Sequence, residues 1–492
     1  MCGLAGLWRV NCTAIEEMMR ALCHRGPDDN GQYALEHTVL GHRRLAIVDC
    51  EGGHQPIINE DGSAATAVNG EIYNAADLRE RLTGRHRFRS GSDSEVALHL
   101  YEDDGAGAVR SLDGMFALAI AKEDELFLAR DPIGIKPLYV SIDRDSVAFA
   151  SEIKALLSHA GSVCEFPPGT WFRTDVGFRQ YFRLPEPTPT NLSCEDLEGR
   201  LCAALNDAVE KRMMSDVPLG TFLSGGLDSS VIAALVRERL SDLHTVSVGL
   251  SGSPDLEAAR NVADHLGTIH HEYVFTAEEI IEALPTIIYH LESFDVDLVR
   301  SAVPCYFASR LAAEHMKVVL TGEGADELFA GYRYHQCLHG DALRDELARS
   351  VAALHNMNLQ RVDRMTMAHS IEGRVPFLDL KVIELALRIP SDLKLRGAPP
   401  VEKWILRRTF EDKLPAEIIW RKKKQFDEGS GTAELLPQLA PEMAEWFGVS
   451  SNGVSTAREL EQRVYRSLFC RYFPTALERL VARWRGGEAQ DN

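Results

Sequence analysis

The second residue of the chain is a cysteine whose position could make it a nucleophile. Cys2 is followed by Gly3 and a short run of small and apolar residues. Initiator methionine is readily removed before a small residue. Removal would leave Cys2 at the N-terminus, where its own α-amino group, of pKa about 8, can take the thiol proton. Taken alone, a cysteine in this position is more often a buried, inert side chain, so the motifs around it must decide.

Four polar, turn-rich clusters accompany Cys2 in the first hundred residues. They span His24–Asp28, Gly41–Leu45, Asn69–Asn74 and Gly91–Glu95. Turns at strand ends commonly carry binding groups. Arginine and aspartate side chains can hold an amino acid by its carboxylate and ammonium groups, and Gly and Asn amides can form an oxyanion hole. The clusters therefore favour an amino-acid site built around Cys2.

A second motif is typical of a phosphate-binding loop. The apolar segment Leu219–Leu223 runs into Ser224-Gly225-Gly226-Leu227-Asp228-Ser229-Ser230, and a helix is predicted from Val231. Glycines let the backbone approach a phosphate, the helix N-terminus binds it, and Asp228 can reach a bridging Mg²⁺. The lysine of a Walker loop is missing. A plain glycine-rich turn is the structural alternative, but the seven-residue pattern favours phosphate binding.

Acidic residues follow another predicted strand further along the chain. Thr321–Tyr332 comes directly after Lys317–Leu320, and its acids could supply a second Mg²⁺ ligand, Asp326, and a base or acceptor-orienting group, Glu323. A solvated acidic turn is the alternative. The triplet 270–272 (His-His-Glu) lacks the HExxH spacing, so no metal role is expected there.

The pattern of predicted elements divides the chain into two domains. Short alternating segments (Gly41–Asp49, Ala64–Val68, Met115–Ala121, Leu126–Ala129 and Ser146–Ala150) predict stacked, mostly antiparallel sheets upstream. Downstream, helical stretches alternate with brief apolar strands such as Leu219–Leu223, Thr245–Val248 and Lys317–Leu320, which predicts a parallel α/β sheet. We place the domains at residues 2–184 and 192–492, with the Pro-rich linker at 185–191. After Gly431 the sequence is irregular until a helical pattern resumes over Glu459–Tyr472.

Composition limits the partners and the compartment. The formal net charge is −20, which argues against a nucleic-acid partner and against an anionic membrane surface. No apolar run approaches the ~18 residues of a spanning helix, and the N-terminus does not resemble a secretory signal. The ten cysteines form no CxxC pair, so we expect a reduced, cytoplasmic protein.

The N-terminal motifs strongly resemble the class II glutamine amidotransferase domain, from Cys2 to about Arg183. The resemblance implies an α+β N-terminal-nucleophile hydrolase domain, an αββα sandwich. It also implies that the thiol attacks the glutamine amide, releasing ammonia and a glutamyl thioester that water hydrolyses. The residues it implicates are Cys2 as nucleophile, Arg44 on the glutamine carboxylate, Asp93 and Glu71 at the ammonium, and Asn69 and Gly70 as the oxyanion hole.

The second half resembles the ATP-pyrophosphatase enzymes, and the two halves together resemble glutamine-dependent asparagine synthetases. The resemblance implies a doubly wound parallel α/β sheet and a site for ATP and Mg²⁺. The ATP site would comprise Leu223, Ser224, Gly225, Gly226, Asp228, Ser229, Val248, Thr321 and Gly322, with Asp228 and Asp326 on the metal and Lys423 on the reacting phosphate. Aspartate and ATP would form an acyl-adenylate with release of pyrophosphate, and ammonia from glutamine would reach it through a tunnel. The products would be asparagine, AMP, pyrophosphate and glutamate. The resemblance also implies a homodimer.

The acceptor region departs from this family pattern. The family usually has Thr-(Thr/Leu)-Ile-Arg where this chain has Asp297-Leu298-Val299-Arg300. Arg300, the expected partner of an acceptor carboxylate, is kept, and Glu323 is expected at the same acceptor site. Asp297, however, replaces a hydroxyl-bearing residue. An acid there could repel a dicarboxylate or pair with a cation of another acceptor. An amidotransferase that acts on a different carboxylate is therefore the alternative. A glutaminase or binding protein without synthetase activity is disfavoured by the intact motifs.

Overall fold

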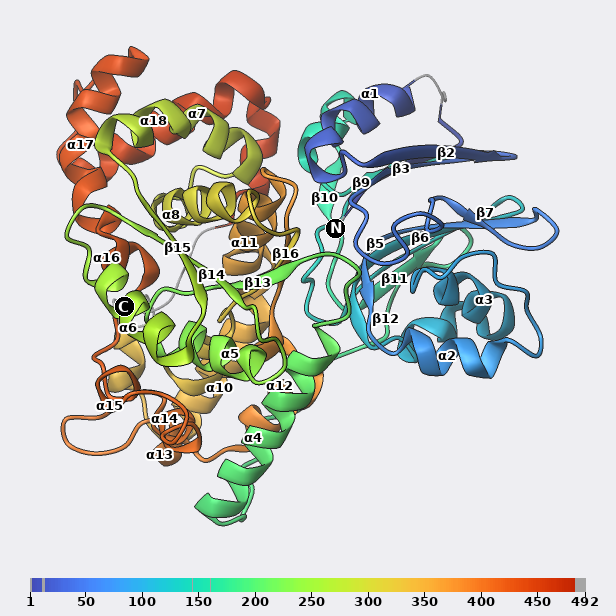
Figure 1. Cartoon of the computed structure of the whole chain (residues 1–492). Coiled ribbons are helices and arrows are strands. Elements are labelled where there is room, and N and C mark those ends of the chain that lie inside the picture. Colours follow the sequence, from blue (N-terminus) through green and yellow to red (C-terminus); the bar gives the residue numbers. More distant parts are fainter. Residues whose placement is uncertain (1, 11–13, 144, 160, 483–492) are drawn as a thin grey trace.

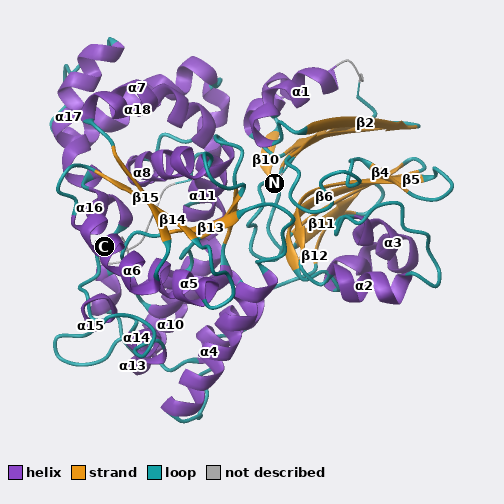
Figure 2. Ribbon diagram, in the orientation of Figure 1, coloured by secondary structure: helices purple, strands orange, loops and turns teal. Residues whose placement is uncertain are grey.

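The structure, a computed structural model, describes residues 2–10, 14–143, 145–159 and 161–482. Figure 1 shows two bodies side by side, a sandwich of two sheets at the right and a helix-covered sheet at the left. Figure 2 shows the same division by element type: most long strands belong to the sandwich and most helices to the other body.

The N-terminal domain is a sandwich of two six-stranded antiparallel sheets. The first sheet has the order β10 (Val163–Glu165), β8 (Tyr139–Asp143), β9 (Ser146–Ala150), β1 (Gly3–Trp8), β3 (Thr38–Arg44) and β2 (Asp29–Leu35). The second has the order β12 (Gly177–Gln180), β11 (Thr170–Arg173), β7 (Glu125–Arg130), β6 (Gly114–Lys122), β5 (Ala64–Ile72) and β4 (Ile57–Ile58). Helix α1 (Ile15–Ala21) packs on the first sheet, and α2 (Ala75–Leu82) and α3 (Glu95–Asp104) pack on the second.

Small residues bring the two sheets close together. Ala65 and Ala67 of β5 and Ala117 and Ala119 of β6 are fully buried in the core between the sheets, where larger side chains such as Phe149 fill the remaining space. Alternate strand residues point to opposite faces, so the same strands also pack against the covering helices. This arrangement is the predicted αββα sandwich.

The C-terminal domain is built on a five-stranded sheet whose strands are all parallel. The order is β15 (Ile269–Val274), β14 (His244–Gly249), β13 (Leu219–Phe222), β16 (Val318–Leu320) and β17 (Glu372–Arg374). One face packs on α7 (Ala277–Leu291), α8 (Val296–Ala312) and α11 (Asn358–Met367), and the other on α4 (Cys194–Lys211), α5 (Leu227–Arg237) and α6 (Pro254–Leu266). The sheet is therefore doubly wound, as predicted.

Short and peripheral helices complete the domain. They are α9 (Ala325–Phe329), α10 (Gly340–Ala353), α12 (Leu380–Arg388), α13 (Ser391–Lys394), α14 (Trp404–Thr409), α15 (Ala416–Ile419), α16 (Phe426–Ser430), α17 (Thr432–Phe447) and α18 (Ala457–Tyr472). Short 3₁₀ segments lie at Cys23–Arg25, Gly105–Arg110, Ile153–His159, Arg333–Cys337, Leu354–Asn356, Pro376–Leu378 and Thr475–Leu480. Among the described residues, no helix has the length and apolar character needed to cross a bilayer.

Three local expectations need adjustment. The segment after Gly431 forms helix α17 rather than an irregular tail, although it contains Pro437 and Pro441. Helix α5 begins at Leu227, four residues before the predicted start, so Asp228 lies in its first turn. Strand β3 ends at Arg44 instead of continuing to Asp49, because the carbonyls of the following turn bind the Arg44 guanidinium.

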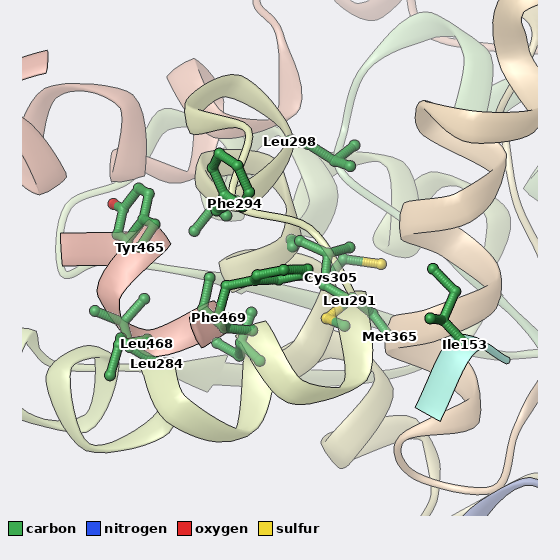
Figure 3. Close-up of a cluster of buried hydrophobic side chains, with 14 of the residues drawn as sticks. Ile153, Leu284, Leu291, Phe294, Leu298, Cys305, Met365, Tyr465, Leu468 and Phe469 are labelled. Carbon is green, nitrogen blue, oxygen red and sulfur yellow. The ribbon is translucent and has the colours of Figure 1, made fainter. Parts of the chain in front are cut away.

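The two domains share a continuous core. Residues 181–193 carry neither helix nor strand and connect β12 to α4. Figure 3 shows Ile153 of the N-terminal domain beside Leu291 and Met365 of the C-terminal domain, in one cluster of buried side chains. Arg25, fully buried, donates to both carboxylate oxygens of Asp363, at 2.8 and 3.1 Å. Breaking a buried pair of this kind leaves an uncompensated charge, so these contacts hold the domains in one relative position.

Candidate active site

A cavity of about 420 Å³ opens at the carboxyl ends of the parallel strands. The strand order reverses at the neighbouring strands β13 and β16, which makes this edge a topological switch point, where ligands bind in open α/β sheets. Leu223 after β13, Val248 near the end of β14 and Thr321 after β16 all line the cavity. Three predicted nucleotide-site residues from separate strands are thus brought together.

The predicted phosphate loop lines the same cavity. Ser224 and Ser229 brace the loop, since their hydroxyls lie 3.0 Å apart and the Ser229 hydroxyl accepts from the Ser224 amide at 3.2 Å. Gly226 precedes the first turn of α5 and lines the cavity, whereas Gly225 is outside the described lining. Gly225 has φ +68°, and a Cβ there would lie 2.5 Å from α6, so it serves loop packing.

Two lysines hold the two predicted metal-binding acids. Lys403, which lies at the start of α14 with an almost fully buried side chain, forms ion pairs with Asp228 and with Asp326. Lys423 lies 2.8 Å from the second of these carboxylates. The two ammonium groups outweigh the burial of the carboxyl and hold the pKa of Asp326 well below its usual range. Asp228 and Lys423 also line the cavity, which therefore has both anions and cations on its wall.

Glu323 is partly buried at the cavity wall and pairs with Arg361 of α11. Burial raises the pKa of the Glu323 carboxyl, although the guanidinium acts in the opposite direction. Its neighbour Glu327 is affected more strongly: burial and the nearby Asp326 raise its pKa to about 7. A carboxylate poised in this way can orient a substrate group or accept a proton.

The two predicted acceptor residues on α8 are both engaged by α18. Asp297 lines the cavity and accepts two hydrogen bonds from the Arg458 guanidinium, each of 2.7 Å. Arg300 lies outside the described lining and binds Glu461, whose side chain is fully buried and requires a cationic partner. The negative charge expected at Asp297 is therefore already paired in the structure.

The cavity brings together most of the residues predicted for the second site, but several of its cations were not predicted. The predicted residues present are Leu223, Ser224, Gly226, Asp228, Ser229, Val248, Asp297, Thr321, Gly322, Glu323, Asp326 and Lys423. The cations that were not predicted include Lys403 and Arg361. Lys403 lies within a segment that resembles the synthetase family, but nothing in its local spacing indicates an ion pair with acids in two distant helices.

Around Cys2 the structure assembles a second polar site. Cys2 is buried at the entry to β1, and its backbone amide donates to the Asn69 side-chain oxygen at 2.9 Å. The Asn69 amide nitrogen, also buried, has no hydrogen-bond partner among the described residues, so it is available to a ligand oxygen. Burial raises the pKa of the Cys2 thiol, so activation requires a nearby base.

Neighbouring strand ends complete this site. The Arg44 side chain is fixed by the carbonyls of Val48 (3.0 Å), Asp49 (2.6 Å) and Cys50 (3.1 Å). Gly70, next to Asn69 on β5, has φ +148°, and a Cβ there would lie 1.9 Å from a β6 carbonyl. Only glycine allows the strands to approach so closely at this point.

Two buried carboxylates lie beside these strands. Asp93 accepts from the Ile72 amide at 2.7 Å, and burial raises its pKa to about 6. Glu71 lies 3.6 Å from Arg374 of the C-terminal domain, and burial together with the neighbouring acids raises its pKa. A cationic ligand would therefore stabilise the ionised form of both carboxylates.

Comparison with known proteins agrees with this division. Residues 1–169 match the family described as "Glutamine amidotransferase domain", and residues 200–343 and 336–478 match the family described as "Asparagine synthase". The chain is similar to "Asparagine synthetase B (glutamine-hydrolyzing)" of Escherichia coli (strain K12), with 39% identity covering 96% of this chain and 92% of the relative. It is also similar to "Probable asparagine synthetase (glutamine-hydrolyzing)" of Dictyostelium discoideum, with 43% identity covering 83% of this chain and 80% of the relative. With "Asparagine synthetase (glutamine-hydrolyzing) 2" of Arabidopsis thaliana it shares 40% identity, covering 94% of this chain and 85% of the relative.

The fold and the domain matches together define a glutamine amidotransferase domain joined to an ATP-pyrophosphatase-type synthetase domain. With about 40% identity over most of its length, the chain belongs to the family of glutamine-hydrolysing asparagine synthetases.

Proposed function

We propose that this protein is an ATP-dependent carbon–nitrogen ligase that makes asparagine from aspartate with glutamine as the nitrogen donor. The observation that carries the proposal is the presence, in one chain, of two separate polar sites. One surrounds a buried N-terminal cysteine, and the other surrounds a phosphate loop faced by two acids and two lysines. The names of the relatives support aspartate as the acceptor.

The first site supplies ammonia in this proposal. After removal of Met1, the Cys2 thiolate attacks the glutamine amide carbon, with the Cys2 α-amino group as base. The free Asn69 amide nitrogen and the Gly70 backbone stabilise the oxyanion. Arg44 holds the glutamine carboxylate, while Asp93 and Glu71 favour its ammonium group. Ammonia and a glutamyl thioester result, and water hydrolyses the thioester to glutamate.

The second site activates the acceptor. ATP would lie along Leu223, Ser224–Gly226, Ser229, Val248, Thr321 and Gly322, with its phosphates at the N-terminus of α5. A carboxylate oxygen of aspartate attacks the α-phosphorus and pyrophosphate leaves; ammonia then displaces AMP from the acyl-adenylate. Lys423 offsets charge on the reacting phosphates, and Glu323 orients the acceptor or accepts a proton.

The acid pair of this site suits Mg²⁺. Asp228 has one buried carboxylate oxygen, Oδ1, without a hydrogen-bond partner among the described residues, and Asp326 faces the same lysine. Hard carboxylate oxygens in the first turns of two helices, α5 and α9, form the donor set that Mg²⁺ prefers alongside substrate phosphates. Asp228 and Asp326 would hold the ion, and the bound ion would offset charge on the phosphates.

On the acceptor side, Asp297, Arg300 and Glu323 remain the proposed residues. The Arg458 pairing neutralises Asp297, which supports aspartate rather than another acid. Arg300 would exchange its Glu461 contact for the acceptor carboxylate. We further propose domain limits of 2–184 and 192–492, a homodimer and a cytoplasmic location, on the family resemblance and the cysteine pattern.

The proposal is tested by incubating the protein with ATP, Mg²⁺, glutamine and aspartate and measuring pyrophosphate and asparagine together. Stoichiometric formation of both is the expected result. Glutamate release with little pyrophosphate or asparagine would overturn aspartate as the acceptor.

A further inference from the structure

Three histidines from separate segments meet near the amino-terminal ends of the parallel strands, away from the cavity at their carboxyl ends. His244 is the first residue of β14, His271 is the third residue of β15, and His315 follows α8 just before β16. One ring nitrogen of each lies within 4.8 Å of the others. The cavity lies at the carboxyl ends of these strands and none of the three histidines lines it, so the histidines form a separate feature.

The strand register explains why these side chains meet. Val246 pairs with His271 across β14 and β15, and His244 lies two residues before Val246, so both histidines face the same side of the sheet. Nδ1 of His244 lies 3.0 Å from Nε2 of His271. The rings of His271 and His315 stack with centroids 3.7 Å apart and an interplanar angle of 16°, so one of them must rotate before both can direct a nitrogen at the same ion. Two imidazole nitrogens on one tetrahedral Zn²⁺ lie about 3.3 Å apart, close to the first of these distances.

We propose that His244, His271 and His315 bind a divalent transition-metal ion such as Zn²⁺, with water in the fourth position. Three imidazole nitrogens suit Zn²⁺, Ni²⁺ or Cu²⁺ rather than Mg²⁺, which prefers oxygen ligands.

The bound ion would tie β14 and β15 to the segment that enters β16. It would stabilise the folded synthetase domain by mass action, because the unfolded chain does not hold the three ligands together. The site takes no part in the proposed ligase chemistry, so it stands or falls independently of the proposed function.

Two other groups serve as controls. His270 is adjacent to His271 but points to the other face, where its ring nitrogens contact the hydroxyls of Thr245 at 2.8 Å and Ser247 at 3.1 Å. A second histidine-containing group, Glu60, His86, His99 and Glu102, is already satisfied by ion pairs. Despite burial, hydrogen bonds to Glu102 and Glu95 raise the pKa of His99 to about 9, which disfavours its neutral, metal-binding form.

The test is a Co²⁺ titration of the metal-free full-length protein in excess Mg²⁺, followed by visible absorption and calorimetry. We expect one equivalent to bind with nitrogen-ligand d–d bands, and Zn²⁺ to displace it and raise Tm by a few degrees. Loss of a second-shell partner costs ~10–100-fold in affinity, so His271→Gln and His315→Gln, which remove ligands, should weaken binding by at least ~100-fold.

His270→Gln and His86→Gln should bind Co²⁺ as the unmodified protein does. A far-UV circular dichroism spectrum and a metal-free Tm equal to those of the unmodified protein verify that each variant is folded. The proposal is overturned if no equivalent binds, if His271→Gln and His315→Gln retain the bands, if His86→Gln loses them, or if a sulfur-to-cobalt charge-transfer band shows thiolate ligation.

Discussion

The two candidate sites both contain buried carboxylates, but their surroundings differ. Beside Cys2, burial raises the pKa values of Asp93 and Glu71. In the synthetase cavity, Lys403 and Lys423 hold the pKa of Asp326 well below its usual range. Asp93 of the first site has no ion-pair partner among the described residues, whereas Asp228 and Asp326 of the second site share a lysine.

This difference matches the charges of the proposed substrates. The ammonium group of glutamine would supply the cation that Asp93 lacks, so that binding and ionisation of the carboxyl reinforce each other. ATP brings negative charge, and lysines fixed beside its site can offset that charge without rearrangement. A buried acid pair alone therefore does not reveal its ligand; the neighbouring cations do.

Removing the nucleophile separates the two sites most sharply. Cys2→Ala should reduce glutamine-dependent asparagine synthesis by ~10³-fold or more, because no other group can form the thioester. Synthesis from added ammonium salt should remain, since the second site is untouched. Both rates are measured as asparagine formed per enzyme. Loss of the ammonia-dependent rate as well would show that the sites do not divide the work as proposed.

The reverse separation uses a lysine of the second site. Lys403→Ala should reduce ATP–pyrophosphate exchange by ~10²–10³-fold, because Asp228 and Asp326 would lose the cation that they share. Glutaminase activity should stay near the unmodified level and also reports on folding. Lys413→Ala is the matched control, since it removes a lysine that pairs with Glu238 on the surface. Unchanged exchange in Lys403→Ala would remove this residue from the site.

Contiguous motifs and distant contacts differ in how far sequence could predict them. The loop 224–230 is predictable because one short segment carries the glycines, hydroxyls and acid needed at a strand-to-helix turn. The Lys403 ion pair was missed because it joins residues 175 positions apart, and only the sheet topology brings them together. The pairing of Arg300 with Glu461 across 161 positions was missed for the same reason.

Local structure also escaped sequence analysis where packing outweighs propensity. Helix α17 contains Pro437 and Pro441, which ordinarily interrupt a helix, yet its apolar face is buried against α7, α8 and α18. Apolar alternation and strand–helix alternation extend over whole domains, so they predicted stacked antiparallel sheets and a parallel α/β sheet; the αββα order and the double winding were implied by the family resemblance. Figure 3 shows the part that was not predicted, the side chains that join those domains into one core.

The pH dependence of the glutaminase site tests its unpaired acid. The pKa of Asp93 is raised to about 6, so the folded protein favours the protonated carboxyl. The protonated carboxyl therefore contributes to the free energy of unfolding below pH 3.8, the ordinary pKa, and this contribution is lost as the pH rises to about 6. Glutamine requires the ionised form, so ionisation of Asp93 should add a rise in kcat/KM of up to tenfold per pH unit below about pH 6, separate from the later rise toward the pKa of about 8 of the Cys2 α-amino base.

Asp93→Asn should flatten that rise and lower kcat/KM by ~10–100-fold above about pH 7, because it replaces a charge-assisted contact. Initial glutaminase rates between about pH 5 and pH 8 measure both effects, and Asp77→Asn, at an exposed acid of α2, is the control. A rise with the same midpoint in Asp93→Asn would assign the titration to another group.

The smallest effect is expected at the acceptor end, where charges are paired but half exposed. The side chains of Asp297 and Arg458 are 46% and 53% exposed. Exposed pairs contribute about 0–1 kcal/mol to folding, so Arg458→Ala should shift the free energy of unfolding by no more than about 1 kcal/mol. It would, however, leave Asp297 as an unpaired anion on the cavity wall. The KM for aspartate should therefore rise by several-fold, whereas kcat at saturating aspartate and the KM for ATP should stay near their original values.

Asp297→Thr in the Arg458→Ala background completes the comparison, because it removes the unpaired anion and should restore the KM for aspartate. If the KM stays high in the double variant, Arg458 itself contacts the acceptor. If Arg458→Ala alone leaves the KM unchanged, Asp297 does not govern acceptor choice. If the KM for aspartate rises in Arg458→Ala and returns when Asp297 is also replaced, then pairing of Asp297 with Arg458 is what lets the site bind a dicarboxylate substrate.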